Sequence, residues 1–282
     1  YLNYTKAAQE LNLTQPAVSQ HIRYLENFYQ VQLFYHAGKK VELTRAGELL
    51  RNSALTFKHD EIYLMRMLQD TAKNTRNFAF GATLSVAEFM LPPDLERLIC
   101  AYPQSHIRME VGNTRELLSK LDAGELDFAV VEGEFPREEY EFLLYRKEPY
   151  VPVASRKKAE QYRNAEFREL LSERLILREP GSGTREILER ELRRRGMTTD
   201  DFSQITELGN IGAIQAMLRA NLGISFFYQA TLTDRETQLA PIELKDFSLE
   251  HEVMFIFRKN SSFREDYEEI YAFLTNRENS QN

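Results

Sequence analysis

The most constraining feature of this sequence is a pair of short helices with a tight turn between them, predicted within residues 3–28. Apolar residues form one stripe on the first helix: Ala7, Ala8 and Leu11. Asn12 and Leu13 then turn the chain, and Thr14 stands where an N-cap residue is favoured. On the second helix three apolar residues share a face through i, i+4, i+7 spacing: Val18, Ile22 and Leu25. The segment is therefore predicted to form a helix-turn-helix.

The opposite face of the second helix carries amide, hydroxyl and guanidinium groups. Amides match donor and acceptor groups on base edges, and arginine binds guanine or phosphate, so this face suits a DNA major groove. The residues predicted to contact DNA from this helix and its start are Thr14, Gln15, Pro16, Ser19, Gln20 and Arg23. A two-helix corner buried in a core would show the same apolar spacing, and the segments that follow favour DNA binding.

Residues 31–47 predict two short extended pieces around the Gly38-Lys39-Lys40 turn, which is the shape of a wing beside a recognition helix. The side chains of Lys39 and Lys40 are expected to meet DNA phosphates. Thr44 is then placed to cap a long helix that runs to about Lys73. This succession predicts a winged helix-turn-helix followed by a linker helix.

The long helix carries a seam whose members recur at alternating spacings of three and four: Leu50, Ala54, Phe57, Glu61, Leu64 and Leu68. Such a seam is buried only against a partner helix, so a homodimer through this helix is predicted.

The distribution of charge along the chain is consistent with DNA binding by its N-terminal part. Residues 1–45 hold five Lys/Arg and three Asp/Glu, a net charge of +2, against −9 for the other 237 residues. Because this basic excess is small, specific binding is expected to need several DNA-binding heads.

Length and composition set further limits. A chain of 282 residues, 43% of them hydrophobic, can bury the cores of two or three domains. No run approaches the ~20 apolar residues of a membrane span, and no signal peptide is visible. The single cysteine, Cys100, cannot form an internal disulfide and is predicted to be a buried core thiol in a reducing cytoplasm.

From Asn77 onward, strands and helices alternate in two sets, which predicts an α/β architecture with two lobes. The first set has strands 78–81, 107–111 and 128–131 and helices 91–102 and 115–123. The second has strands 175–177, 205–208 and 224–227 and helices 184–195 and 211–220, after which strand 253–257 and helix 263–274 return to the first lobe. Ligands bind at strand ends in sheets of this type, so a cleft between the lobes is expected.

Hydroxyls, amides and free N–H groups gather at the helix starts around this cleft and favour a small, negatively charged effector. The candidate contacts are Thr83, Ser85, Asn113, Thr114, Ser182, Gly183, Thr184 and Asn210. Thr114 and Thr184 would also be good N-caps without a ligand, and the glycines at 181 and 183 would also serve a turn.

QPAVSQHIRYLE at 15–26 and LFYHAGKKVELTRAGE at 33–48 resemble the winged helix-turn-helix and linker helix of LysR-type transcriptional regulators. LPPDLERL, VGNTRELLSKLDAGELDFAVVEG, GSGTRE and ANLGISF resemble the effector-binding domain of the same family, which has a periplasmic-binding-protein-like fold. The expected domains are 1–45 for DNA binding, 46–73 for the linker helix, and 77–282 for effector binding. Within the last, lobe 1 is about 77–150 and 251–282, and lobe 2 about 151–250.

The resemblance implies a cytoplasmic bacterial regulator that binds double-stranded operator DNA, pairs two dimers into a homotetramer, and can also contact RNA polymerase. It implies effector binding by hydroxyls in the first loop and in the loop 181–184. The GSGTRE form is similar to members that sense sulfur oxyanions or phosphorylated metabolites. Two departures stand out. The family normally has a further helix before the position where this sequence begins, so the sequence is expected to start inside the DNA-binding domain. His36, which titrates near neutrality, stands where arginine is common.

Catalysis has little support in the sequence. The histidines at 21, 36, 59, 106 and 251 lack metal-ligand spacing, and neither G-x-S-x-G nor H-E-x-x-H occurs. PGSGTR lacks the G-K-[ST] ending of a phosphate-binding loop. No enzyme activity, metal or cofactor is expected. A two-lobed solute-binding protein, which would need export, and an interaction module with an unresponsive cleft are the alternatives. Ligand-dependent stabilisation would separate a sensor from the interaction module.

Overall fold

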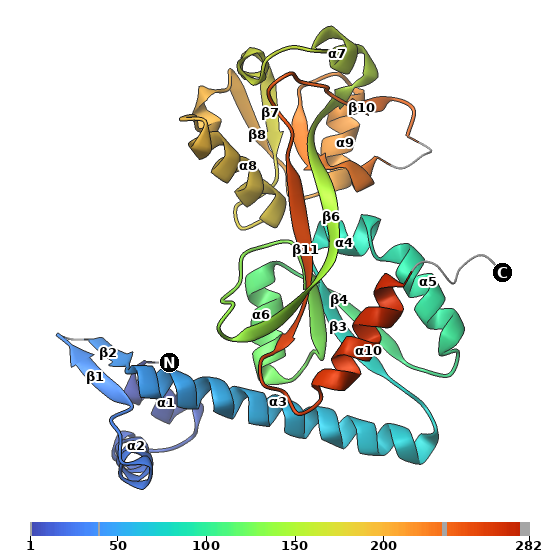
Figure 1. Ribbon diagram of the computed structural model, residues 1–282. Helices are drawn as coiled ribbons and strands as arrows, with labels where there is room; N and C mark the ends of the chain where they lie inside the picture. Colours follow the sequence, from blue (N-terminus) through green and yellow to red (C-terminus); the bar gives the residue numbers. More distant parts are fainter. Residues whose placement is uncertain (1, 39, 233–235, 277–282) are drawn as a thin grey trace. The chain divides into compact units, whose positions relative to one another are not determined.

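The computed structural model describes residues 2–38, 40–232 and 236–276, and the chain divides into two compact units, Tyr1–Lys58 and His59–Asn282 (Figure 1). In the first unit, helix α1 (Tyr4–Glu10) is capped by Asn3, which accepts a hydrogen bond from the Lys6 N–H at 2.9 Å. Helix α2 (Gln15–Tyr29) is capped by Thr14, as predicted. Strands β1 (Phe34–Ala37) and β2 (Lys40–Leu43) pair antiparallel next to Gly38, whose φ of 65° suits the turn. The helix-turn-helix and the wing are thus confirmed.

One detail of the first helix was predicted wrongly. Leu11 does not complete its apolar stripe, because α1 ends at Glu10 and Leu11 is the C-cap, with 59% of its surface exposed.

Helix α3 (Arg45–Lys73) begins and ends as predicted, and the Thr44 hydroxyl accepts a hydrogen bond from the Gly47 N–H at 3.0 Å. Along its predicted seam Phe57 is 71% exposed, and Leu64 and Leu68 are exposed as well. The partner helix for this seam stays a prediction.

A mixed sheet runs through the described part of the second unit in the order β10-β6-β11-β5-β3-β4, with β9 also paired to β6. Strand β3 (Phe78–Ala82) lies between β4 (Ile107–Val111) and β5 (Phe128–Val131), and both pairings are parallel. Strands β7 (Arg174–Leu177) and β8 (Gln204–Glu207) form a separate parallel pair. These parallel strands are the α/β framework that the sequence predicted.

Two long strands connect the lobes (Figure 1). Strand β6 (Tyr140–Ser155) pairs antiparallel with β11 (Glu250–Arg258) over its first part, and then with β9 (Ser225–Tyr228) and β10 (Leu239–Pro241). Its first part therefore belongs to lobe 1, with β3, β4 and β5, and its last part to lobe 2, with β7 to β10. Strand β6 was not predicted, because its charged residues and two prolines look like a connecting segment.

Helices cover both faces of each lobe. In lobe 1, α6 (Thr114–Ala123) packs on one face, and α5 (Pro92–Ala101) and α10 (Arg264–Thr275) on the other. In lobe 2, α8 (Gly183–Arg194) and α9 (Ile211–Arg219) contribute to different clusters of buried apolar residues. Shorter helices were missed by the sequence analysis: α4 (Leu84–Phe89), α7 (Arg156–Gln161), η1 (Phe167–Ser172), η2 (Thr199–Asp201) and η3 (Gln229–Thr231).

The prediction for Cys100 was wrong: its thiol is exposed. Leu98 faces the core of lobe 1, and a residue two positions later on a helix lies on the opposite side, toward solvent. Among the described residues, no helix is long and apolar enough to cross a membrane.

Candidate functional site

The parallel strands of lobe 1 deliver three loops to one edge of the sheet. Because β4 and β5 both run parallel to β3, the residues that follow these strands meet at their carboxyl ends. Thr83 follows β3, Asn113 and Thr114 follow β4, and Glu132 follows β5. The Thr83 N–H donates a hydrogen bond to the Val130 carbonyl of β5 at 3.2 Å, which ties the first of these loops to the third.

Two hydroxyls at this edge are buried without a partner. Thr83 is the N-cap of α4 but makes no side-chain cap hydrogen bond, and Ser85 lies in the first turn of that helix. Their exposed fractions are 4% and 1%, and among the described residues neither hydroxyl has a hydrogen-bond partner. Buried hydroxyls are nearly always paired, so these two are available to a ligand.

Two other predicted residues already have structural roles. Asn113 caps α6 in a capping box with Glu116, and Asn210 caps α9 by accepting a hydrogen bond from the Ala213 N–H at 2.9 Å. Both asparagines are exposed. Thr114 was expected to cap α6 and does not, because Asn113 takes that position and Thr114 is the first residue of the helix. The half-buried Thr114 side chain instead lies against Gly133, in the loop after β5.

The start of α8 forms the facing part of lobe 2. Thr184 was expected as its N-cap, but Ser182 is the N-cap and Thr184 lies inside the helix. The Ser182 hydroxyl makes no cap hydrogen bond, since it pairs with the Thr184 hydroxyl at 2.9 Å, while Tyr150 donates to the Thr184 carbonyl at 2.7 Å. No acceptor among the described residues bonds the first-turn N–H groups of α8, at 183–185. These N–H groups are therefore available to an anion.

Glu132, in lobe 1, lies against Gly183 at the start of α8 in lobe 2, and it was not predicted as a site residue. A Cβ atom added to Gly183 would lie 2.9 Å from Glu132 Cγ, so only glycine lets the start of α8 come this close. The Glu132 side chain is 4% exposed, and among the described residues its Oε2 has no hydrogen-bond partner. Burial raises the pKa of the Glu132 carboxyl to about 8, because desolvation outweighs the opposing effect of Arg178.

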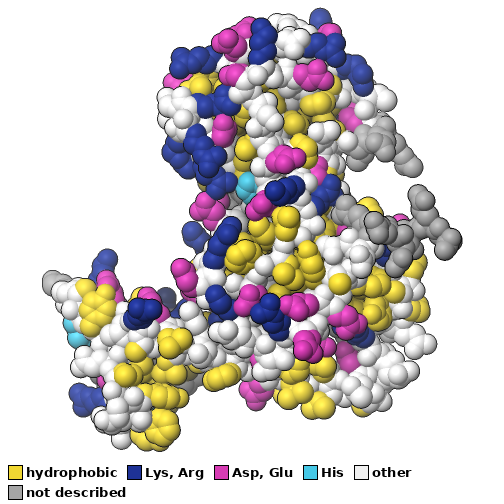
Figure 2. Space-filling view, viewed as in Figure 1, with side chains coloured by type: hydrophobic (Ala, Val, Ile, Leu, Met, Phe, Trp, Pro, Cys, Tyr) yellow, Lys and Arg dark blue, Asp and Glu magenta, His cyan; other side chains and the backbone are white. Residues whose placement is uncertain are grey.

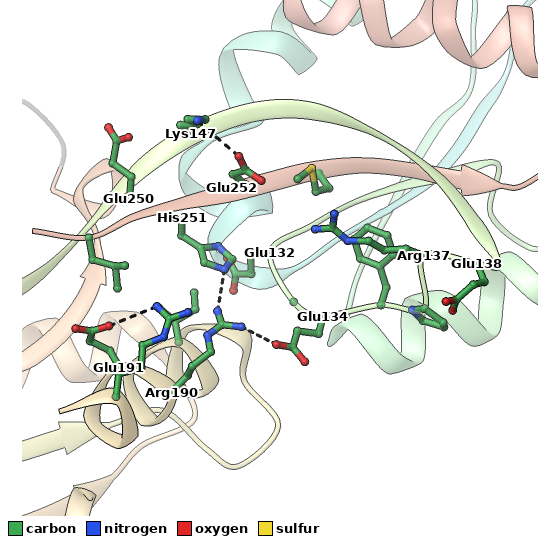
Figure 3. A pocket seen from close by; sticks show the side chains of 17 residues that line it. Glu132, Glu134, Arg137, Glu138, Lys147, Arg190, Glu191, Glu250, His251 and Glu252 are labelled. Atoms are coloured by element: carbon green, nitrogen blue, oxygen red, sulfur yellow. Dashed lines mark hydrogen bonds and ion pairs between the residues drawn. The ribbon is translucent and has the colours of Figure 1, made fainter. Parts of the chain in front are cut away.

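Glu132 also lines a pocket of about 830 Å³ between the loop 132–138, helix α8 and strand β11 (Figure 3). Figure 2 shows side chains of both charges around the notch between the lobes on this side. In the pocket, Arg190 bonds both Glu134, at 2.6 Å, and His251 Nε2, at 3.3 Å. None of the eight effector residues predicted from the sequence is among its lining residues.

The contacts of His251 fix its tautomer. Burial, and then the charge of Arg190, lowers the pKa of His251 to about 4, so the ring is neutral. A guanidinium group can only donate, so Nε2 accepts from Arg190 and Nδ1 carries the proton. Nδ1 therefore donates to the Tyr228 hydroxyl, 3.0 Å away. The hydroxyl proton of the buried Tyr228 is left for another acceptor, and the described residues supply none.

The candidate DNA surface lies on the first unit. Thr14, Gln15, Pro16, Gln20 and Arg23 are exposed on α2 and its N-cap, whereas Ser19 is half-buried and accepts a hydrogen bond from Gln15 Nε2 at 3.0 Å. Lys40 is exposed at the start of β2, and Lys39 lies outside the described residues. The polar face predicted for α2 is thus present, with Ser19 less accessible than the rest.

Comparison with known proteins connects both surfaces to one family. Residues 1–48 match the model of bacterial regulatory helix-turn-helix proteins of the lysR family, and residues 72–278 match the LysR substrate binding domain. The chain belongs to the LysR family of transcriptional regulators. It is similar to the HTH-type transcriptional regulator CysL of Bacillus subtilis, with 27% identity over 97% of this chain and 91% of that protein. It is also similar to the transcriptional activator CmpR of Synechocystis, with 28% identity over 92% of this chain and 85% of that protein.

Solved structures agree on the fold of this LysR-family chain. The CcmR regulatory domain of Synechocystis in complex with 2-PG has a TM-score of 0.62 and 22% identity, covering 72% of this chain and 99% of that one. A hydrogen peroxide-bound OxyR mutant of Corynebacterium glutamicum has a TM-score of 0.64 and 22% identity, covering 97% of this chain and 87% of that one. The chain is therefore a LysR-type regulator with an effector-binding domain. The two relatives named above are transcriptional regulators.

Proposed function

We propose that this regulator senses a small oxyanion in the cleft between its two lobes and that the bound anion changes how it engages operator DNA. The observation that carries the proposal is the combination of unpaired hydroxyls on Thr83 and Ser85 with the uncapped start of α8. Hydroxyls and helix-start N–H groups are the donors that bind anions without a full opposing charge.

The ligand in the CcmR structure, 2-PG, supports a small-molecule effector in this fold. We include 2-PG as one probe among several, since a likeness at 22% identity does not carry ligand identity. The exposed Asn113 and Asn210 are secondary contacts at most in this proposal, because both side chains already cap helices.

On the DNA side, α2 presents Gln15, Gln20 and Arg23 to the major groove, and Lys40 in the wing binds phosphate. We further propose a dimer through the exposed seam of α3 and a tetramer of two such dimers, acting on operator DNA in the bacterial cytoplasm. Four DNA-binding heads in one assembly would offset the small positive charge of each.

A thermal-shift screen of the whole chain with sulfate, phosphate and 2-PG tests the effector proposal, followed by anisotropy with operator DNA and the anion that binds. Ser85→Ala should abolish the ligand shift and leave the unliganded melting temperature nearly unchanged, because its hydroxyl has no partner to lose. Ser225→Ala is the matched control. Its hydroxyl is equally buried but donates to the Ile176 carbonyl at 2.6 Å, so this variant should lose stability and keep the ligand shift. A normal ligand shift in Ser85→Ala would place the anion elsewhere.

A further inference from the structure

Glu132 is an acidic group in surroundings that otherwise offer hydrogen-bond donors. It lies against the positive end of α8, a helix of 12 residues, and shares its pocket with His251, whose partner Tyr228 has a free hydroxyl proton. An ionised carboxylate in this position would be expected to accept hydrogen bonds from several of these donors. Its buried Oε2 accepts none from the described residues. This geometry fits a carboxyl group whose Oε2 atom is free to bond a ligand.

The cation that acts on Glu132, Arg178, and the one that bonds its neighbour His251, Arg190, are each paired with another carboxylate. Arg178 donates to Glu179 through two nitrogens, each at 2.7 Å, and Arg190 is paired with Glu134. Four other groups that act on Glu132 or lie with it add no positive charge: Glu186, the neutral ring of His251, and the phenols of Tyr150 and Tyr228. Of the other cations that line the pocket, Lys147 pairs with Glu252, Arg194 pairs with Glu191, and Arg137 lies over the ring of Phe142. Neither Arg178 nor Arg190 is therefore left unpaired to hold two negative charges, one on Glu132 and one on the ligand.

We propose that Glu132 binds the effector as a neutral carboxyl group that donates its proton to an oxygen of the anion, so that anion and proton occupy the cleft together. This proposal rests on the proposed function. It assigns the ligand to oxyanions whose oxygen atoms only accept hydrogen bonds, and it predicts that the affinity for the ligand depends on pH. An ionised Glu132 would repel the ligand at close range in a buried site, whereas the neutral form supplies one more donor beside the start of α8.

The expected pH dependence has a definite sign. With its pKa near 8, Glu132 already holds its proton at neutral pH, so anion affinity is flat there. Above pH 8 the proton must be taken up from solution on binding, and affinity falls by up to about tenfold per pH unit. His251, with a pKa of about 4, does not titrate in this range, and burial raises the pKa values of Tyr150 and Tyr228 well above it. A cationic ligand would give the opposite trend, with proton release and affinity rising with pH.

Titration calorimetry of the whole chain with sulfate from pH 6.5 to 9.5 tests the coupling, since sulfate itself does not titrate there. At pH 8.5, buffers of different ionisation enthalpy should reveal net proton uptake by the wild type. Glu132→Gln keeps a donor but cannot ionise, so its sulfate affinity should not vary with pH. Glu138→Gln, on the same loop and exposed, is the control and should retain the wild-type fall.

An equal fall in Glu132→Gln and wild type, or binding by the wild type without proton uptake at pH 8.5, would overturn the inference and leave the anion site standing. Absence of sulfate binding to the wild type at every pH would refute the anion site itself, and this inference with it. If Glu132→Gln does not fold, the proton count of the wild type alone decides the question.

Discussion

The buried Glu132 should leave a signature in the stability of the free protein. Its pKa is about 8 when folded, against an ordinary value of 4.5. Between these values the folded chain holds a proton that the unfolded chain has lost, so the free energy of unfolding falls as pH rises. One proton corresponds to a slope of about 1.4 kcal/mol per pH unit. Over the whole interval the fall reaches about 4–5 kcal/mol, and above pH 8 it levels off.

Glu132→Gln removes this titration, so the difference in unfolding free energy between variant and wild type should grow in favour of the variant from pH 5 to pH 8. Urea unfolding of both proteins at half-unit pH intervals, followed by circular dichroism, measures that difference. The comparison is differential, so other titrating groups cancel and a constant offset from the buried amide does not change the slope. Parallel curves for the two proteins would show that Glu132 titrates normally, and the argument from burial would then fail.

Four further substitutions test other parts of the structure. Gly183→Ala should push the start of α8 away from Glu132, because the new Cβ would lie 2.9 Å from Glu132 Cγ. Calorimetry should then measure weaker binding of sulfate than in the wild type. Phe57→Asp should split the proposed α3 dimer in light scattering, since it puts a charge in an apolar seam; an intact assembly would contradict the seam. Arg23→Ala should weaken operator binding by ~1–3 kcal/mol in anisotropy, whereas Lys40→Ala should weaken binding to all DNA and reduce its salt dependence.

Local sequence signals were sufficient for many of the regular elements, though not for all. Apolar spacing and caps predicted α2 from Thr14 onward, and the short buried strand β5 was predicted at its observed bounds. Strand β6 was missed, because it passes from one lobe to the other and changes its neighbours along its length. Its residues therefore follow no single alternation, and Pro149 and Pro152 interrupt it. Only the tertiary pairing with β11 makes this segment a strand.

The site was predictable in its hydroxyls and not in its acid. Thr83 and Ser85 were expected from their position after a strand, and the structure leaves both without partners. Several neighbouring polar residues at a helix start can serve as the N-cap, and the sequence does not show which one does. Asn113 and Ser182 therefore occupy the N-cap positions where Thr114 and Thr184 were expected. Glu132 follows a buried strand just as a solvated loop residue would. Its burial depends on α8, from which it is separated by some 50 residues, and on the glycine at 183.

The contact between Glu132 and Gly183 also links the position of the two lobes to the protonation state of the Glu132 carboxyl group. Glu132 belongs to lobe 1 and Gly183 to lobe 2, so the distance between the lobes sets how far the carboxyl group is removed from water. Desolvation favours the neutral form, and the proposed anion also requires it. Proton and anion would therefore favour the same approach of the lobes, each in proportion to its difference in affinity between the near and the separated arrangement. A regulator built in this way responds to the anion most strongly where Glu132 is already neutral, which is below its pKa of about 8.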